Sequence, residues 1–193
     1  MPGAQQVLPV FEPILESLQH QTQIPIVLPT EIPTDAIVPF PAEQGGAQPY
    51  INVPITQGGH FQHISASIVD VDPAFYSVSL DAAPNCQGAD ACSFGELTGE
   101  QVYQDTPSIQ AEYFEQNSFD YQPVGRSPES PGKVTLNRGI EGYFVQFVCG
   151  ANCNFSKLIW QQNSYRYMAG IRMASQATVV NFANSIIENE IKP

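Results

Sequence analysis

Apolar and polar residues alternate along the second half of the chain in the pattern typical of β-strands. The runs YFVQFVC (143–149), CNFSKLIWQQ (153–162) and YRYMAGI (165–171) follow one another, with Asn163 and Ser164 between the last two. Successive side chains of a strand point to opposite faces of a sheet, so such runs present one apolar face. Together with the shorter KVTL (133–136), they predict an antiparallel meander.

The chain ends in a helical pattern. Ser175 is a favourable N-cap, and a single apolar stripe follows it, made of Val179, Phe182, Ala183, Ile186 and Ile187. A stripe of this kind needs a partner, and the apolar face of the meander is the natural one. We therefore expect an α+β fold, in which an antiparallel sheet of four to six strands is packed by a C-terminal helix.

The first half of the chain is less regular. Val10, Leu15 and Leu18 recur at helical spacing, and ten of the 17 prolines fall before residue 55. That proline density favours an extended segment, and its Ile, Val and Leu content indicates that it lies against the core. Two further strands are predicted, HISASIVDV and FYSVSL, on either side of a turn at Asp72–Pro73.

These patterns predict a single domain over residues 1–193. Its expected parts are a helix with a proline-rich segment wrapping the core (1–55), the first strands and a cysteine loop (56–98), a polar insert (99–132), and the meander with its helix (133–193). The length is sufficient for one domain with a substantial core. No apolar run approaches the ~20 residues needed to span a bilayer.

The four cysteines form two local pairs, Cys86 with Cys92 and Cys149 with Cys153. A three-residue hairpin loop places its flanking residues opposite each other, at a separation that a disulfide spans. Zinc pairs are usually spaced C-x2–4-C, which the first pair exceeds, and neither pair is the redox C-x-x-C motif. Local disulfides are favoured, with free buried thiols and zinc as alternatives. Disulfides indicate an oxidising compartment, so we expect an exported protein, periplasmic, cell-surface or secreted, whose signal or lipoprotein leader is missing.

Charge is unevenly distributed. All seven basic residues lie from Arg126 onward, whereas residues 1–125 carry 15 acidic residues, within a net charge of −12. Such a chain repels phosphate backbones, so nucleic acid is not an expected partner. The acidic half is interpreted as a solvated surface or, alternatively, as a cation site.

Catalytic signatures are lacking in the sequence: there is no G-x-S-x-G, S-x-x-K, P-loop or H-E-x-x-H motif. His60 and His63 are three residues apart without an evident third ligand, which favours a surface pair over a metal pair. Asp70, Asp72 and Asp81 are the candidate cation ligands, with solvated turn carboxylates as the alternative. We expect no catalytic residue, no resident metal and no cofactor.

Aromatic residues crowd the predicted meander. Trp160, Tyr165 and Tyr167 are either cross-strand core packing or an exposed surface for a ligand or partner, for example a sugar-stacking platform. The segment WQQNSYRYMAGIRMASQATVVNFANSII resembles a domain of unknown function found in extracytoplasmic bacterial proteins and lipoproteins. There, a Trp strand and a Tyr strand precede a helix ending in Ala-Asn-Ser, matched here by Trp160, Tyr167, Ala183, Asn184 and Ser185.

The resemblance implies an envelope-facing domain without established catalysis. The leading functional hypothesis is therefore an exported, non-catalytic interaction or accessory domain with a protein or glycan partner. The alternative is a carbohydrate-binding module or glycan-directed hydrolase that uses Trp160 and surface carboxylates.

Overall fold

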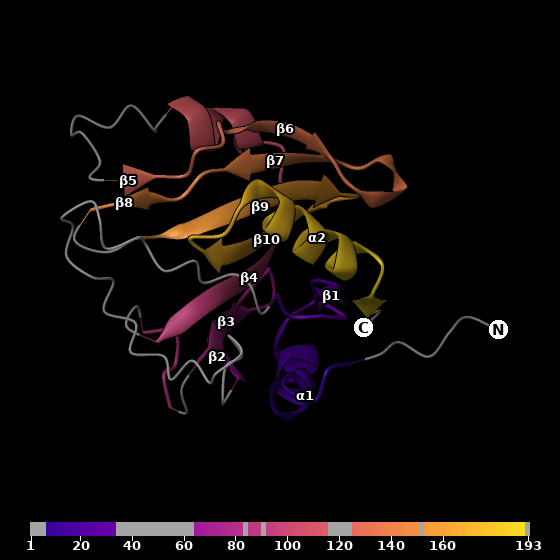
Figure 1. The fold of residues 1–193 in the computed structure, drawn as a ribbon. Helices are drawn as coiled ribbons and strands as arrows, with labels where there is room; N and C mark the ends of the chain where they lie inside the picture. The colour runs from indigo at the N-terminus through magenta and orange to yellow at the C-terminus, as the bar shows by residue number, and fades with distance from the viewer. Residues whose placement is uncertain are drawn as a thin grey trace.

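The protein is built around one antiparallel sheet (Figure 1). The computed structural model describes residues 7–33, 64–82, 85–89, 92–115, 125–150 and 153–191. Within these ranges the sheet has seven strands, one more than the largest number expected. In their order across the sheet, they are β2 (Ser65–Asp72), β3 (Phe75–Asp81), β4 (Ser93–Gln101), β10 (Tyr165–Arg172), β9 (Phe155–Gln162), β7 (Glu141–Val145) and β6 (Gly132–Thr135).

Two meanders make up this sheet. The strands β2, β3 and β4 follow one another along the chain, as do β6, β7, β9 and β10, and the last strand of each meander pairs with the other. The β4–β10 register runs from Gln101 opposite Tyr165 to Gly95 opposite Ile171. This junction brings together segments more than 60 residues apart in the chain, and it makes β4 and β10 the centre of the sheet.

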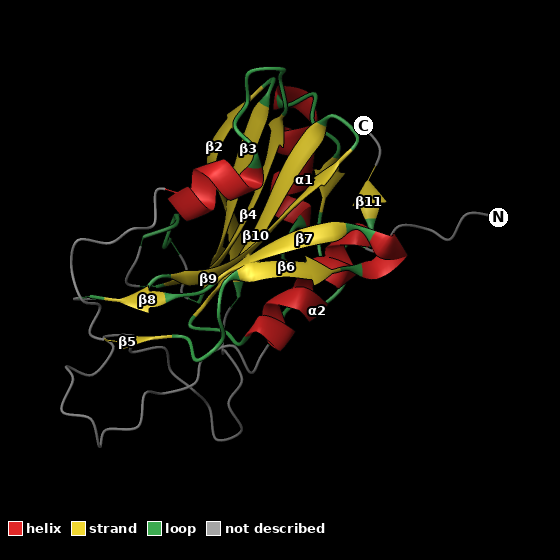
Figure 2. Ribbon diagram, turned by 90° about the horizontal axis from the view of Figure 1, so that it is seen from above, coloured by secondary structure: helices red, strands yellow, loops and turns green. Residues whose placement is uncertain are grey.

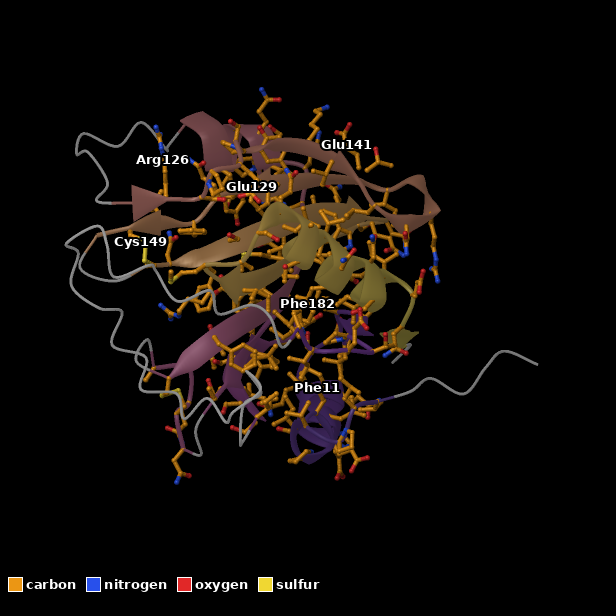
Figure 3. The ribbon with its side chains drawn as sticks, in the orientation of Figure 1. Phe11, Arg126, Glu129, Glu141, Cys149 and Phe182 are labelled. Carbon is orange, nitrogen blue, oxygen red and sulfur yellow. A yellow bond between two sulfur atoms is a disulfide. The ribbon has the colours of Figure 1, made fainter. Side chains whose placement is uncertain are left out.

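Helices α1 (Glu12–Gln21) and α2 (Gln176–Ile187) cover one face of the sheet, and the core lies beneath them (Figures 2 and 3). The predicted C-terminal helix is confirmed, with Ser175 as its N-cap: the Ser175 hydroxyl accepts a hydrogen bond from the Thr178 backbone N–H at 3.2 Å. Phe11 and Phe182 are fully buried in this core, on the side of the molecule where both helices lie.

A short N-terminal stretch after α1 lies on the same face. Its strand β1 (Ile26–Val27) pairs with β11 (Glu190–Ile191), which follows α2. The Tyr167 hydroxyl donates to the Pro25 carbonyl at 3.3 Å, and the Tyr76 hydroxyl accepts from the Val27 N–H at 3.3 Å. These contacts hold residues 25–27 against the sheet. The rest of the predicted proline-rich segment, residues 34–55, lies outside the described residues.

Strand β4 was not predicted, and the expected polar insert at 99–132 overlaps its last three residues. Its core-facing positions include Gly95 and Gly99, so the apolar alternation that marks a strand is missing. Gly99 is required by close packing: a Cβ atom there would lie 2.4 Å from Cε1 of the buried Tyr76 ring. The Tyr76 ring of β3 thus fills the space that a side chain at position 99 of β4 would occupy.

The described residues of the expected insert beyond β4 contain further elements. They include η2 (Ala111–Glu115) and β5 (Gly125–Arg126), and β5 pairs with β8 (Val148–Cys149) in a separate ribbon. The predicted strand 143–149 is therefore divided between β7 and β8, because the chain leaves the main sheet after Val145. A short turn of helix, η3 (Asn137–Gly139), joins β6 to β7.

Candidate functional site: the disulfide end of the sheet

All four cysteines are paired within the chain. Cys86 is bonded to Cys92 and Cys149 to Cys153, and no cysteine is free. Cys149 and Cys153 are antiparallel bridge partners, as expected for residues that flank a three-residue hairpin loop. The two bonds occupy the sulfur atoms that the free-thiol and zinc alternatives require.

Both disulfide loops lie at the same end of the sheet. The Cys86–Cys92 loop connects the end of β3 to the start of β4, and the Cys149–Cys153 loop precedes the start of β9. The strand registers align these points, since Ser93 is opposite Asp81 and Phe155 is opposite Arg172. We call this region, residues 85–89, 92–93, 147–150, 153–155 and 172–175, the disulfide end; Cys149 marks it in Figure 3.

Arg172 connects the two loops. Its Nε donates to the Ser93 carbonyl at 2.9 Å, next to Cys92, and its Nη1 donates to the Cys153 carbonyl at 2.6 Å. The guanidinium carbon lies 4.6 Å from the centre of the Phe155 ring, within the range of a cation–π contact. Because the side chain is buried, these charge-assisted hydrogen bonds are shielded from water and hold both loops to β10.

A buried carboxylate lies beside the first loop. Asp81 is 0 % exposed, and its two oxygens accept hydrogen bonds from Ser67 Oγ at 2.8 Å and Ser79 Oγ at 2.5 Å. Ser79 Oγ lies 2.8 Å from Ser93 Oγ, whose residue also binds Arg172 through its carbonyl. Polar groups at this depth are tolerated when each has partners, and here the three hydroxyls supply them.

The Cys86–Cys92 loop packs over this network. Gly88 has a φ of +76°, and a Cβ atom there would lie 2.9 Å from Val69 Cγ2 and 3.4 Å from Ser79 Cβ. Only a residue without a side chain fits this left-handed conformation and close approach. The first disulfide therefore fixes a loop that packs over the hydrogen-bonded network of Asp81 and the serine hydroxyls.

The second loop has its own small apolar cluster. Phe147, Cys149 and Met173 are buried together, with Cys153 packed against them, apart from the main core. Asn154 stabilises the turn, because its Oδ1 accepts from the Val148 N–H at 2.7 Å. This end of the molecule is thus shaped by covalent bonds and local contacts rather than by the helices.

The start of α2 adjoins the disulfide end, which includes its N-cap Ser175. Glu129, from the segment after β5, accepts a hydrogen bond from the Gln176 N–H at 3.2 Å and another from the Ser127 hydroxyl. Burial alone would raise the pKa of Glu129, but the hydrogen bonds from Ser127, from its own N–H and from Gln176 outweigh it, and the pKa is lowered. A carboxylate at a helix N-terminus also interacts favourably with the helix dipole.

The candidate cation site is not assembled. Asp72 is opposite Phe75 at the turn between β2 and β3, whereas Asp81 is opposite Ser65 at the other end of that hairpin. Asp72 instead accepts from the Ala74 N–H at 2.6 Å, and Asp70 is exposed. Within the described residues, no group of three His, Cys, Asp or Glu side chains is placed to hold a metal ion. His60 and His63 lie outside the described residues.

The candidate aromatic surface is also corrected. Trp160 is 1 % exposed and Tyr167 is 3 % exposed, because both point into the core beneath the helices, where their ring centroids are 5.7 Å apart. Only Tyr165 of the three is partly accessible. The cross-strand packing alternative accounts for Trp160 and Tyr167, and a sugar-stacking platform built on Trp160 does not fit the structure.

Sequence reasoning missed the two buried arginines of β10, Arg166 and Arg172. Both alternate with core residues and thus point to the face of the sheet opposite the helices. Their period-2 position within β10 could have identified their face, but no local pattern indicates their partners, which lie 54 residues away for Glu112 and 79 for Ser93.

No family model, curated protein or solved structure matches the chain. In the part of the chain that the structure describes, none of the helices combines the length and apolar character needed to cross a membrane.

Proposed function

We propose that the chain is an extracytoplasmic interaction domain without catalysis, and that its binding surface is the disulfide end. The observation that carries this proposal is the gathering of all four cysteines, in two local bonds, at one end of the sheet. Both loops are further joined through Arg172. Disulfides persist mainly in oxidising compartments, which favours a location outside the cytosol.

The size of the two disulfide loops supports a role in shaping a surface. Bonds between cysteines that are 6 and 4 positions apart in the chain remove little entropy from the unfolded chain, roughly 2 kcal/mol each in the chain-entropy model. Larger loops would stabilise the fold more. Binding residues are concentrated on loops held by a rigid scaffold, so braced loops on a seven-stranded sheet are suited to recognition.

The resemblance to extracytoplasmic domains supports the same location. The Trp strand, the Tyr strand and the helix of that pattern correspond to β9, β10 and α2, in this order along the chain. The partner class remains a protein or a glycan. The carbohydrate alternative depended on an exposed Trp160, and with that residue buried no observation favours it over the interaction domain.

Site-specific photo-crosslinking tests the proposal. Arg126, in β5, is exposed and sits opposite Val148 beside the second disulfide loop, whereas Arg138, in η3, is exposed at the opposite end of β7 and β9. We expect a photoreactive residue at position 126, in cells that express the protein, to give a discrete adduct that position 138 does not give. Replacing Cys149 and Cys153 together by serine should abolish the adduct. Equal labelling from both positions, or no adduct from position 126, would contradict the assigned surface.

A further inference from the structure

A second charged region lies away from the disulfide end, on the face of the sheet opposite the two helices. At its centre is Arg166 of β10, which is only 3 % exposed. Its Nη1 lies 2.5 Å from Glu112 Oε2 of η2 and 3.2 Å from Glu100 Oε1 of β4. Its Nη2 donates to the Pro107 carbonyl, so one side chain binds two points of the segment between β4 and η2.

The backbone of the segment between β4 and η2 makes hydrogen bonds to the β9–β10 turn and within itself. Its start is tied to the β9–β10 turn, because the Val102 N–H donates to the Ser164 carbonyl at 2.8 Å. Beyond this, Thr106 and Glu112 bond to backbone carbonyls within the segment itself, those of Tyr103 and Ser108. These local hydrogen bonds shape the segment, and Arg166 bonds it to the sheet at Pro107 and Glu112.

The charges around Arg166 come from three elements. Strand β4 contributes Glu96 and Glu100, η2 contributes Glu112 and Tyr113, and β9 contributes Lys157, whose Nζ lies 2.9 Å from Glu96 Oε1. Burial and the neighbouring glutamates raise the pKa of Tyr113 to about 12, so this tyrosine stays neutral at physiological pH. The charge of Arg166 is therefore balanced by Glu100 and Glu112, while Glu96 is paired with Lys157.

We propose that Arg166 and Glu112 form an acid-sensitive latch that holds residues 104–113 against the sheet. When both glutamates beside Arg166 are protonated, a buried guanidinium is left without a counter-charge. A buried unpaired charge is strongly unfavourable, and departure of the segment relieves it by admitting water. The open form exposes a cation at the centre of the sheet face, as a binding point for an acidic group.

The two carboxylates have different roles in this latch. Burial raises the pKa of Glu100, Arg166 opposes the rise and Glu112 adds to it, so Glu100 takes up a proton at a higher pH than an ordinary glutamate. Its protonation removes the repulsion between the two glutamates and leaves Glu112 paired with Arg166. The segment therefore stays closed while either carboxylate is ionised, and opens when both are neutral.

Hydrogen–deuterium exchange of the full chain tests the latch. At pH 7, the double variant Glu100→Gln/Glu112→Gln leaves Arg166 without a counter-charge and should accelerate exchange of the backbone amides of residues 106 and 112 at least tenfold. Glu141→Gln, which breaks the exposed ion pair with Lys133, is the matched control and should leave these rates unchanged. Trp160, the single tryptophan, lies on the other face of the sheet, so its fluorescence verifies that the core remains folded in each variant.

A second comparison separates the two glutamates. Glu100→Gln should retain wild-type protection at pH 7, because Glu112 still binds Arg166. The wild-type segment should lose protection on acidification, after correction for intrinsic exchange, before the Trp160 emission shifts. Exchange rates in the double variant Glu100→Gln/Glu112→Gln within twofold of those in Glu141→Gln would overturn the proposal, whatever the acid behaviour of the wild type.

Discussion

The Nη1 of Arg172 donates a hydrogen bond to the carbonyl of Cys153 at 2.6 Å, and Nε of the same guanidinium donates to Ser93. A strand residue is thereby bonded to the backbone of both disulfide loops. The loops are distant in the chain, and β10 is the element that they share. The disulfide end is consequently one structural unit rather than two separate hairpins.

Replacing Arg172 by methionine keeps the length and removes the hydrogen-bond donors. A buried carbonyl, that of Ser93, and a half-buried one, that of Cys153, lose a charged donor, and we expect the free energy of unfolding to fall by about 2–3 kcal/mol. Urea unfolding followed by circular dichroism measures this change. Arg126→Met is the exposed control and should change stability by less than ~0.5 kcal/mol; equal stabilities of the two variants would show that Arg172 does not hold the loops.

Gly99→Ala tests the close packing of β4 against β3. The new Cβ would meet the buried Tyr76 ring at 2.4 Å, so the core is overpacked and a loss of about 2 kcal/mol is expected. For a chain of this size, that corresponds to a fall of ~4–8 °C in Tm. Gly132→Ala in β6 is the matched control, because a Cβ there meets nothing within 4 Å. The packing argument fails if both variants melt at the wild-type temperature.

Gly95 and Gly99 also explain where prediction from the sequence stopped. Strands β2, β3, β9 and β10 were predicted because their side chains alternate, and α2 because Ser175 precedes a regular apolar stripe. Strand β4 has glycines at two of its core-facing positions, so it lacks the signal on which such predictions rest. Its place in the sheet follows from pairing with β3 and β10, and the ring of Tyr76 on β3 fills the space over Gly99.

The candidate site was predictable in part for a related reason. The cysteine pairs are local, and their spacing alone indicated the correct bonds. Arg172 takes its role from Ser93, across the junction between the two meanders, and Asp81 takes its role from the hydroxyls of Ser67 on β2 and Ser79 on its own strand. Residues of the strand that contains Trp160 point alternately to the two faces of the sheet, and the position of α2 determines which of these faces is buried.

Glu129→Gln tests the carboxylate at the start of α2. Its pKa is lowered in the folded protein, so the ionised form stabilises the fold above the pKa of the unfolded chain, and this contribution is lost as the pH falls through the folded value. We expect the variant to be less stable than the wild type at pH 7 and the difference to shrink as the pH falls below the ordinary glutamate range. Thermal melts across this range provide the measurement, and a pH-independent difference would assign the loss to packing instead.

Glu100→Gln should change the stability at pH 7 in the opposite direction. The raised pKa of Glu100 means that its ionised form opposes folding at neutral pH, and that the folded protein gains stability as the pH falls through that value. The glutamine variant should therefore be more stable than the wild type at pH 7. Because Glu100 is 38 % exposed, solvent screening limits the gain to less than ~1 kcal/mol. The gain should shrink toward pH 4, and a destabilised variant at pH 7 would be incompatible with this electrostatic assignment.

The most direct measurement is the thiol content of the protein isolated from its own cells. The cells are quenched in acid, and the protein is unfolded and treated with an alkylating reagent, with and without prior reduction. We predict no alkylated cysteine before reduction and four after it, with Cys86 linked to Cys92 and Cys149 to Cys153 in the peptide map. Four alkylated cysteines without reduction would contradict both the braced end of the sheet and a location outside the cytosol.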